Sequence, residues 1–265
     1  MNSKIEIMGV LNITDNSFYD GGKFNNLKES INHAKRLIND GADIIDIGAE
    51  SSKPGSDPVS SKDQIRKIEP LVEALREVSN IPISIDTRSS EVINQLLKYK
   101  INIVNDISSL EDKNLLDIVK CNKLSISLMH MLGTPKTMQV NPNYNNVVND
   151  IYNYLKNRAD LCINYGIDKS NIIIDPGFGF GKTLEHNYMI LSNLDKFNHM
   201  GHRVLSGISR KSMIGDVINK TPDGRLYGTL AASVVAIKHN TSILRVHDVR
   251  ETKMLLNFQN LIRNS

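Results

Sequence analysis

The sequence predicts an α/β fold, a single-domain (β/α)8 TIM barrel, from three observations. The 265 residues suit one large α/β domain. Eight short runs rich in β-branched residues are each followed by a longer helical pattern. No linker or low-complexity segment interrupts the series, so residues 1–265 are expected to form one domain. Eight such units at this length match a barrel, and a doubly wound open sheet is the alternative.

Strands and helices are expected to alternate along the whole chain. Strands are predicted where Ile, Val and Leu cluster, at residues 5–11, 42–47, 82–86, 101–105, 124–129, 171–174, 203–208 and 242–246. Helices are predicted between them, at residues 26–39, 61–78, 89–99, 112–120, 144–165, 184–195, 225–238 and 249–263. Ser61 with Gln64 indicates a capping box, and Gly41 and Gly166 follow helical patterns as C-cap glycines do.

Composition and charge exclude several classes of function. The net charge is +3, with both signs interspersed, so no nucleic-acid or membrane partner is expected. Cys121 and Cys162 have no second thiol nearby, which favours reduced, buried thiols over zinc or a disulfide. The first residues lack an apolar signal core and no stretch is long enough to span a bilayer. A cytoplasmic protein is therefore expected.

Polar residues lie at the carboxyl end of every predicted strand, among its last residues or directly after it. They are Asn12, Asp46, Asp86, Asn105 with Asp106, His130, Asp175, Ser209 with Arg210 and Lys211, and Arg245 with His247. Each alone has an ordinary explanation as a turn former, a helix cap or a satisfied structural side chain. In a barrel, however, all these ends share the face on which barrel enzymes carry their sites. The joint pattern therefore predicts one pocket.

The end of the sixth strand is the strongest single candidate for part of that pocket. Three consecutive isoleucines precede Asp175, which is followed by Pro176 and by alternating glycines at 177, 179 and 181. Asp175 can accept hydrogen bonds from the N–H groups of a ligand, and glycines let the backbone approach a ligand closely. A solvated turn that ends the strand is the simpler explanation of these residue types.

The residue types predict a ligand with a polar ring and an anionic tail. Asp86, Asn105 and Asp175 present acceptors and an amide donor, which suits a flat heterocycle rich in N–H and C=O groups. The cationic residues follow the seventh and eighth strands, where barrels commonly bind phosphate.

Eight stretches in order resemble dihydropteroate synthase. They are Gly9–Thr14 with Ser17–Gly22, Gly41–Gly48, Ile85–Thr87, Asn105–Ile107, Leu128–His130, Asp175–Lys182, Ser209–Ser212 and Arg245–Val249. Each is a weak signal alone, but eight in sequence are specific to that family. The resemblance implies a TIM barrel that condenses 6-hydroxymethyl-7,8-dihydropterin pyrophosphate with p-aminobenzoate in folate biosynthesis. It also implies a transferase that releases pyrophosphate, forms a homodimer and is a sulfonamide target.

The resemblance further implies how the pterin ring is bound. Asp86, Asn105, Asp175 and Lys211 match residues that contact the ring in that family, and we take Asp86, Asp175 and Lys211 as the catalytic set. A carboxylate bonded to ring N–H groups stabilises the positive charge that develops as pyrophosphate leaves.

Other positions match contacts to the second substrate, the anion and a metal ion. Arg245 and His247 match the pyrophosphate site, and Asn12 matches an amide oxygen that helps to hold Mg²⁺. The p-aminobenzoate pocket, completed by the loops after the first two strands, is implied to contain Phe18, Ser52, Lys53, Pro54, Phe180 and Ser212. Asp20 is implied to act in closing the first of these loops over pyrophosphate.

The same two loops depart from the family pattern. Asp15 and Asn16 replace a Pro-Asp pair, and Lys53 replaces an arginine. Loss of proline adds conformational freedom to the open loop, and lysine lacks the planar fork with which arginine binds phosphate oxygens. We therefore expect looser loop closure and weaker binding of p-aminobenzoate and sulfonamides.

Two other functions remain as alternatives. A pterin-binding methyltransferase domain shares the barrel and the ring-binding acids, but it has no need of the cationic segments 209–212 and 245–247. A non-catalytic pterin-binding protein would bind the ring without turnover. An assay of pyrophosphate release separates both from a synthase.

Overall fold

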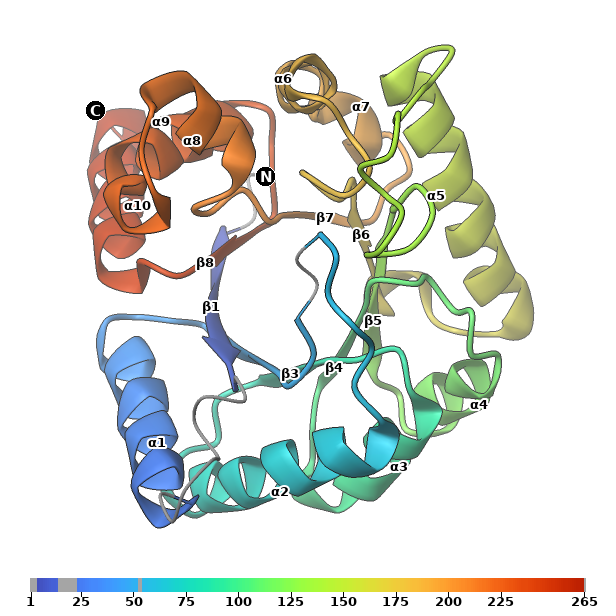
Figure 1. The fold of residues 1–265 in the computed structure, drawn as a ribbon, viewed down its shortest axis with the longest axis vertical. Coiled ribbons are helices and arrows are strands. Elements are labelled where there is room, and N and C mark those ends of the chain that lie inside the picture. The colour runs from blue at the N-terminus through green and yellow to red at the C-terminus, as the bar shows by residue number, and fades with distance from the viewer. Residues whose placement is uncertain (1–3, 14–22, 52–53, 265) are drawn as a thin grey trace.

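The computed structural model describes residues 4–13, 23–51 and 54–264, and it confirms the predicted barrel (Figure 1). Eight parallel strands follow one another around a closed sheet, and the last pairs with the first. They are β1 (Glu6–Asn12), β2 (Ile44–Gly48), β3 (Ile83–Asp86), β4 (Ile103–Asp106), β5 (Ser125–Met129), β6 (Ile172–Asp175), β7 (Arg203–Ser206) and β8 (Ile243–Val246). Every predicted strand is present, with small shifts at its ends.

The helices form an outer layer around the sheet (Figure 1). They are α1 (Lys23–Asn39), α2 (Ser61–Val78), α3 (Ser90–Leu96), α4 (Asn114–Cys121), α5 (Val147–Tyr165), α6 (Leu184–Ser192), α7 (Asp195–Asn198), α8 (Ser212–Ile218), α9 (Leu226–Lys238) and α10 (Val249–Asn264). The short helices α7 and α8 are not predicted from the sequence. The predicted helix 89–99 is divided into α3 and a 3₁₀ turn at Leu97–Tyr99.

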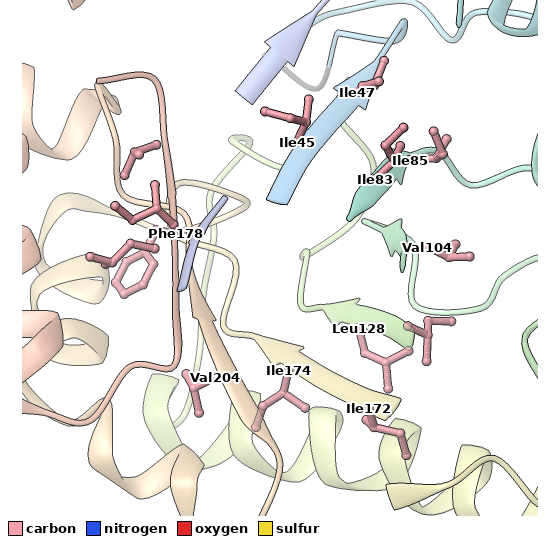
Figure 2. Close-up of a cluster of buried hydrophobic side chains, with 14 of the residues drawn as sticks. Ile45, Ile47, Ile83, Ile85, Val104, Leu128, Ile172, Ile174, Phe178 and Val204 are labelled. Carbon is pink, nitrogen blue, oxygen red and sulfur yellow. The ribbon is translucent and has the colours of Figure 1, made fainter. Parts of the chain in front are cut away.

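Alternation along the strands separates two apolar regions. Outward-facing side chains such as Ile45, Ile47 and Ile85 belong to the large core between sheet and helices (Figure 2). The smaller cluster inside the barrel consists of Met8, Ile44, Ile103, Ile173, Leu205 and Ile243. Because side chains in a strand point alternately to opposite faces, the inward positions nearer the carboxyl ends lie above this cluster. Those positions are mostly polar, and they form the candidate site.

Capping differs from the prediction at one helix. The N-cap of α2 is Ser60, whose Oγ accepts a hydrogen bond from the Asp63 amide at 3.1 Å. Gln64 donates instead to the backbone oxygen of Val59 at 2.9 Å, so the predicted capping box from Ser61 is wrong. Glycines at 41 and 166 adopt the left-handed conformation expected of helix-ending glycines, each with φ of 100°.

Both cysteines are free thiols, as expected, but only one is buried. Cys162 lies in the core, whereas Cys121 is exposed at the end of α4, so its predicted burial is wrong. None of the helices in the described ranges has the length and apolar character that crossing a bilayer requires.

Candidate active site

Strand register brings three of the predicted residues, Asn12, Asp86 and Asn105, to one level of the barrel. Asn12 pairs with Gly48, Gly48 with Asp86, and Asp86 with Asn105. A Cβ atom on Gly48 would lie 3.2 Å from the Cβ of Asp86 and 3.5 Å from Oδ1 of Asn12. The glycine therefore lets the side chains of β1 and β3 approach each other at the mouth of the barrel.

Arg245 lies between two carboxylates inside the mouth. Its Nε donates to Asp46 at 2.7 Å and its Nη2 donates to Asp86 at 2.8 Å. Although burial opposes its charge, the attraction of Asp46 and Asp86 raises the pKa of Arg245. The side chain thus joins β8 to β2 and β3, while its third nitrogen, Nη1, takes part in neither bond.

Asp86 has an unusual protonation equilibrium. Burial raises the pKa of Asp86 to about 7, and the negative charges of Asp46, Glu50 and Asp106 act in the same direction. The positive charge of Arg245 opposes this shift. A carboxyl group with this pKa can be present as either acid or carboxylate near neutral pH.

Asp175 and Lys211 both lie close to Gly207. A Cβ atom on Gly207 would lie 3.9 Å from both Oδ2 of Asp175 and Nζ of Lys211. Oδ1 of Asp175 accepts a hydrogen bond from the Gly177 amide at 2.7 Å. Burial raises the pKa of Asp175, and the positive charge of Lys211 opposes this shift. Burial lowers the pKa of Lys211 to about 8, and the negative charge of Asp175 opposes that shift.

Phe180 lies next to Lys211. The Lys211 Nζ is 4.4 Å from the centre of the Phe180 ring and also donates to the backbone oxygen of Phe178. Phe180 packs in a small apolar cluster with Ile107, Met129 and Met138. Ser212 is exposed at the first turn of α8.

A buried lysine holds the loop that follows β6. Nζ of Lys182 lies 3.0 Å from Nδ1 of His130, 3.2 Å from the His130 backbone oxygen and 2.8 Å from the Phe180 backbone oxygen. No role for Lys182 is predicted from the sequence. Its position directly after three alternating glycines is the signal that could have identified it.

Three strand-end residues singled out from the sequence hold loops instead of facing the mouth. Arg210 donates from Nε and Nη2 to both carboxylate oxygens of Asp248. Asp106 accepts from the Ser108 amide, the Ser108 hydroxyl and the Leu110 amide at 2.6 to 2.8 Å. His130 is the buried partner of Lys182 described above, which agrees with its reading as a structural histidine.

His247 lies at the exposed rim beside Ser209. Its backbone amide donates to the Ser209 hydroxyl at 3.2 Å, and its Nδ1 lies 3.1 Å from the same oxygen. Loss of hydration and the positive charges of Arg245 and Arg210 lower the pKa of His247 to about 4, so the ring is neutral at pH 7.

The loops after β1 and β2 are described only in part. Phe18, Asp20, Ser52 and Lys53, together with Asp15 and Asn16, lie outside the described residues. Pro54 is described and exposed, and the next residue, Gly55, donates its amide hydrogen to the Pro135 backbone oxygen at 3.0 Å. The second loop therefore contacts the loop that follows β5.

Comparisons with known proteins match almost the whole chain. The sequence model of the family described as "Pterin binding enzyme" matches residues 8–247. The dihydropteroate synthase of Haemophilus influenzae is 42% identical over 251 residues, which cover 95% of this chain and 91% of that protein. The crystal structure of Yersinia pestis dihydropteroate synthase with a sulfonamide drug complex is 39% identical, with a TM-score of 0.92, over 98% of this chain and 95% of that one.

A further solved structure is the dihydropteroate synthase of Xanthomonas albilineans in complex with 7,8-dihydropteroate. It is 30% identical, with a TM-score of 0.88, over 100% of this chain and 95% of that one. Identity of this size across a complete barrel shows common descent as well as a common fold. The chain therefore belongs to the pterin-binding enzyme family and, within it, to the dihydropteroate synthases.

Proposed function

We propose that this chain condenses 6-hydroxymethyl-7,8-dihydropterin pyrophosphate with p-aminobenzoate, giving 7,8-dihydropteroate and pyrophosphate for folate biosynthesis. The observation that carries the proposal is the barrel mouth, where Asp86, Asn105 and Asp175 lie on neighbouring or facing strands above an apolar floor. The relatives' names support the reaction, and the relatives' sulfonamide and 7,8-dihydropteroate complexes support small-molecule substrates.

The ring-binding groups are held in place before a ligand arrives. Arg245 fixes Asp86, and the Gly177 amide fixes one oxygen of Asp175. Carboxylates directed at ring N–H groups stabilise the positive charge that develops when the C–O bond to pyrophosphate breaks. The amine nitrogen of p-aminobenzoate forms the new bond to the same methylene carbon and then loses a proton. Lys211, beside Asp175, offers a cation for an oxygen atom of the ring.

We assign the second substrate to the Phe180 side of the mouth. The ring of Phe180 offers an aromatic surface under the Lys211 ammonium group. Ser212 at the start of α8 offers a hydroxyl to the carboxylate of p-aminobenzoate. The remaining members of this pocket are those implied by resemblance in the two loops, of which only Pro54 is described.

The leaving pyrophosphate is assigned to the rim formed by Arg245, His247 and Asn12. Arg245 can offer Nη1, since Nε and Nη2 are bound to carboxylates. Asn12 fits Mg²⁺ because its amide oxygen is a hard ligand at an exposed strand end, and pyrophosphate and water would supply the other oxygens. Bound Mg²⁺ would neutralise charge on the leaving group. In the described ranges, no cluster of three or more His, Cys, Asp or Glu side chains suited to a metal is found.

Two parts of the proposal concern the whole protein. We assign the enzyme to the cytoplasm, where its substrates would be made and its two thiols would stay reduced. We also propose a homodimer, as the family resemblance implies. Light scattering on the purified protein tests the dimer directly, and a monomer at micromolar concentration would contradict it.

A direct assay tests the reaction. Purified protein is mixed with the pterin pyrophosphate, Mg²⁺ and p-aminobenzoate, and release of pyrophosphate is followed. Release should require p-aminobenzoate and should stop when EDTA removes Mg²⁺. Calorimetry should show tighter binding of p-aminobenzoate in the presence of pyrophosphate and Mg²⁺. Ring binding without release would favour the methyltransferase or non-catalytic alternatives, and equal binding with and without pyrophosphate would refute an ordered scheme.

A further inference from the structure

Asp46 lies one level below the ring-binding residues and belongs to neither substrate site described above. It is fully buried on β2, where Gly48 occupies the level above it. Oδ2 of Asp46 accepts from Nε of Arg245 at 2.7 Å. Nδ2 of Asn105 lies 3.3 Å and 3.5 Å from the two carboxylate oxygens of Asp46. A single carboxylate therefore contacts one group from β8 and one from β4.

The chemistry of this contact determines which way the Asn105 amide faces. A carboxylate accepts hydrogen bonds and an amide oxygen cannot donate one, so only the NH₂ end of Asn105 can face Asp46. The opposite end, Oδ1, is then directed away from Asp46. Oδ1 makes no hydrogen bond to any residue in the described part of the chain, although Asn105 is only 4% exposed.

We propose that Asp46 is a positioning residue that orients Asn105 so that Oδ1 accepts a hydrogen bond from an N–H group of the bound ring. Arg245 makes this orientation rigid, because it holds the Asp46 carboxylate with Nε while Nη2 is fixed by Asp86. The inference rests on the proposed function only in taking the ligand to be a pterin.

The proposal makes a specific statement about Asp46→Asn. The new amide can still accept from Arg245 with its oxygen, and it then offers its NH₂ group to Asn105. Asn105 must turn over to accept this hydrogen bond, so its own NH₂ group replaces Oδ1 in facing the ring. The network keeps its hydrogen bonds, but the ligand meets a donor where it needs an acceptor.

A second substitution should reverse this effect. In the double variant Asp46→Asn, Asn105→Asp, the carboxylate at position 105 accepts from the new amide and also presents an oxygen to the ring. Asn105→Asp alone places two carboxylates against each other, which disfavours both folding and ring binding. Positioning thus predicts a strongly non-additive double-mutant cycle.

The test uses calorimetric binding of 6-hydroxymethylpterin, a probe of the ring without pyrophosphate. We expect the Kd to rise on the order of 10- to 100-fold in Asp46→Asn, and the double variant to recover on the order of tenfold. Ser84→Ala is the matched control. Ser84, on β3, is the residue opposite Asp46 in the strand register, and its buried hydroxyl has no partner among the described residues. Its Kd should stay within about twofold of wild type.

Each result decides the proposal. If Asp46→Asn binds the probe as tightly as wild type, or the double variant is weaker than both single variants, Asp46 does not orient Asn105. If Asp46→Asn fails to fold in thermal melting, the double variant must still bind more tightly than Asn105→Asp, and the opposite order refutes the inference. A wild-type protein that does not bind the probe overturns the proposed function instead.

Discussion

Nζ of Lys182 lies 3.0 Å from Nδ1 of His130, and both side chains are buried. Nζ also donates to the backbone oxygens of His130 and Phe180. The lysine therefore joins the end of β5 to the loop after β6. Loss of its nitrogen would leave buried acceptors without partners, which costs more than the hydrogen bonds contribute.

Lys182→Met is expected to lower the free energy of unfolding on the order of 3 kcal/mol, because two buried backbone oxygens lose their donor and Nδ1 of His130 loses its partner. Urea denaturation measures the change. Gln139→Ala is the control, since exposed Gln139 donates to Gly179 in the same loop and should contribute less than about 1 kcal/mol. Equal effects of the two substitutions would contradict the role of Lys182.

The pH dependence provides a second test of Lys182. Burial lowers the pKa of Lys182 well below 10.5, so the unfolded chain binds more protons at alkaline pH than the folded chain. Stability from this group therefore rises with pH up to 10.5. The stability difference between wild type and Lys182→Met should widen over that range, and a constant difference would argue against a buried, shifted amine.

Asp86 should make the catalytic efficiency of the enzyme fall at acidic pH. Because burial raises the pKa of Asp86 to about 7, protonation below that pH would remove the acceptor that we propose for the ring. We expect kcat/KM for the pterin pyrophosphate to fall below about pH 7 in wild type. Asp86→Asn should be much less active, and its kcat/KM should not fall in this way below about pH 7. If kcat/KM of the variant still falls there, the titrating group belongs to the substrate and not to Asp86.

The same shift has the opposite effect on the unliganded protein. The folded chain binds a proton at Asp86 between its ordinary pKa of 3.8 and about 7, where the unfolded chain does not. The contribution of Asp86 to stability therefore increases as pH falls through 7. Melting temperatures of wild type and Asp86→Asn at several pH values measure this difference.

Asp175→Asn should separate catalysis from stability. The new side-chain oxygen can still accept from the Gly177 amide, but the negative charge that we propose to face the ring is lost. Turnover should fall on the order of 10²- to 10³-fold, the size of a preorganised electrostatic contribution. Thermal melting should change little. Normal turnover, or an unfolded variant, would remove Asp175 from the proposed mechanism.

Gly177→Ala should be far more harmful than Gly179→Ala. Both glycines have positive φ, 71° and 81°, so alanine is strained at either by roughly 1–2 kcal/mol. A Cβ at 177 would lie 2.0 Å from the His130 backbone oxygen, whereas at 179 its nearest neighbour is Lys211 Cδ at 3.4 Å. Urea denaturation should rank them in that order, and similar losses would show that the loop can move away from β5.

Strand order and the polar barrel mouth could be predicted from sequence because their causes are local. Each strand is a short β-branched run, and the side chains that follow it are fixed to the barrel face by chain direction alone. The end of β6 is the clearest example, since its three isoleucines are buried and Asp175 lies at the strand end.

Pairings within the site depend on strand register and could not be read from the sequence. Arg245 is predicted to meet pyrophosphate, but its Nε and Nη2 contact Asp46 and Asp86, which are remote in sequence. Arg210 carries the same charge as Lys211 beside it, yet it has a positive φ of 58° and its side chain binds Asp248. Neither the contacts of Arg245 nor the contact of Arg210 with Asp248 produces a local pattern in the composition or periodicity of the sequence.

The bonds of Arg245 also constrain the order in which the chain can mature on the ribosome. Arg245 is 199 residues from Asp46 and 159 residues from Asp86 in the sequence. A nascent chain that has made only the first seven strands carries both acids without their cation, and burying unpaired charges is strongly unfavourable. We therefore expect the barrel to close around Asp46 and Asp86 only after the last strand has left the exit tunnel.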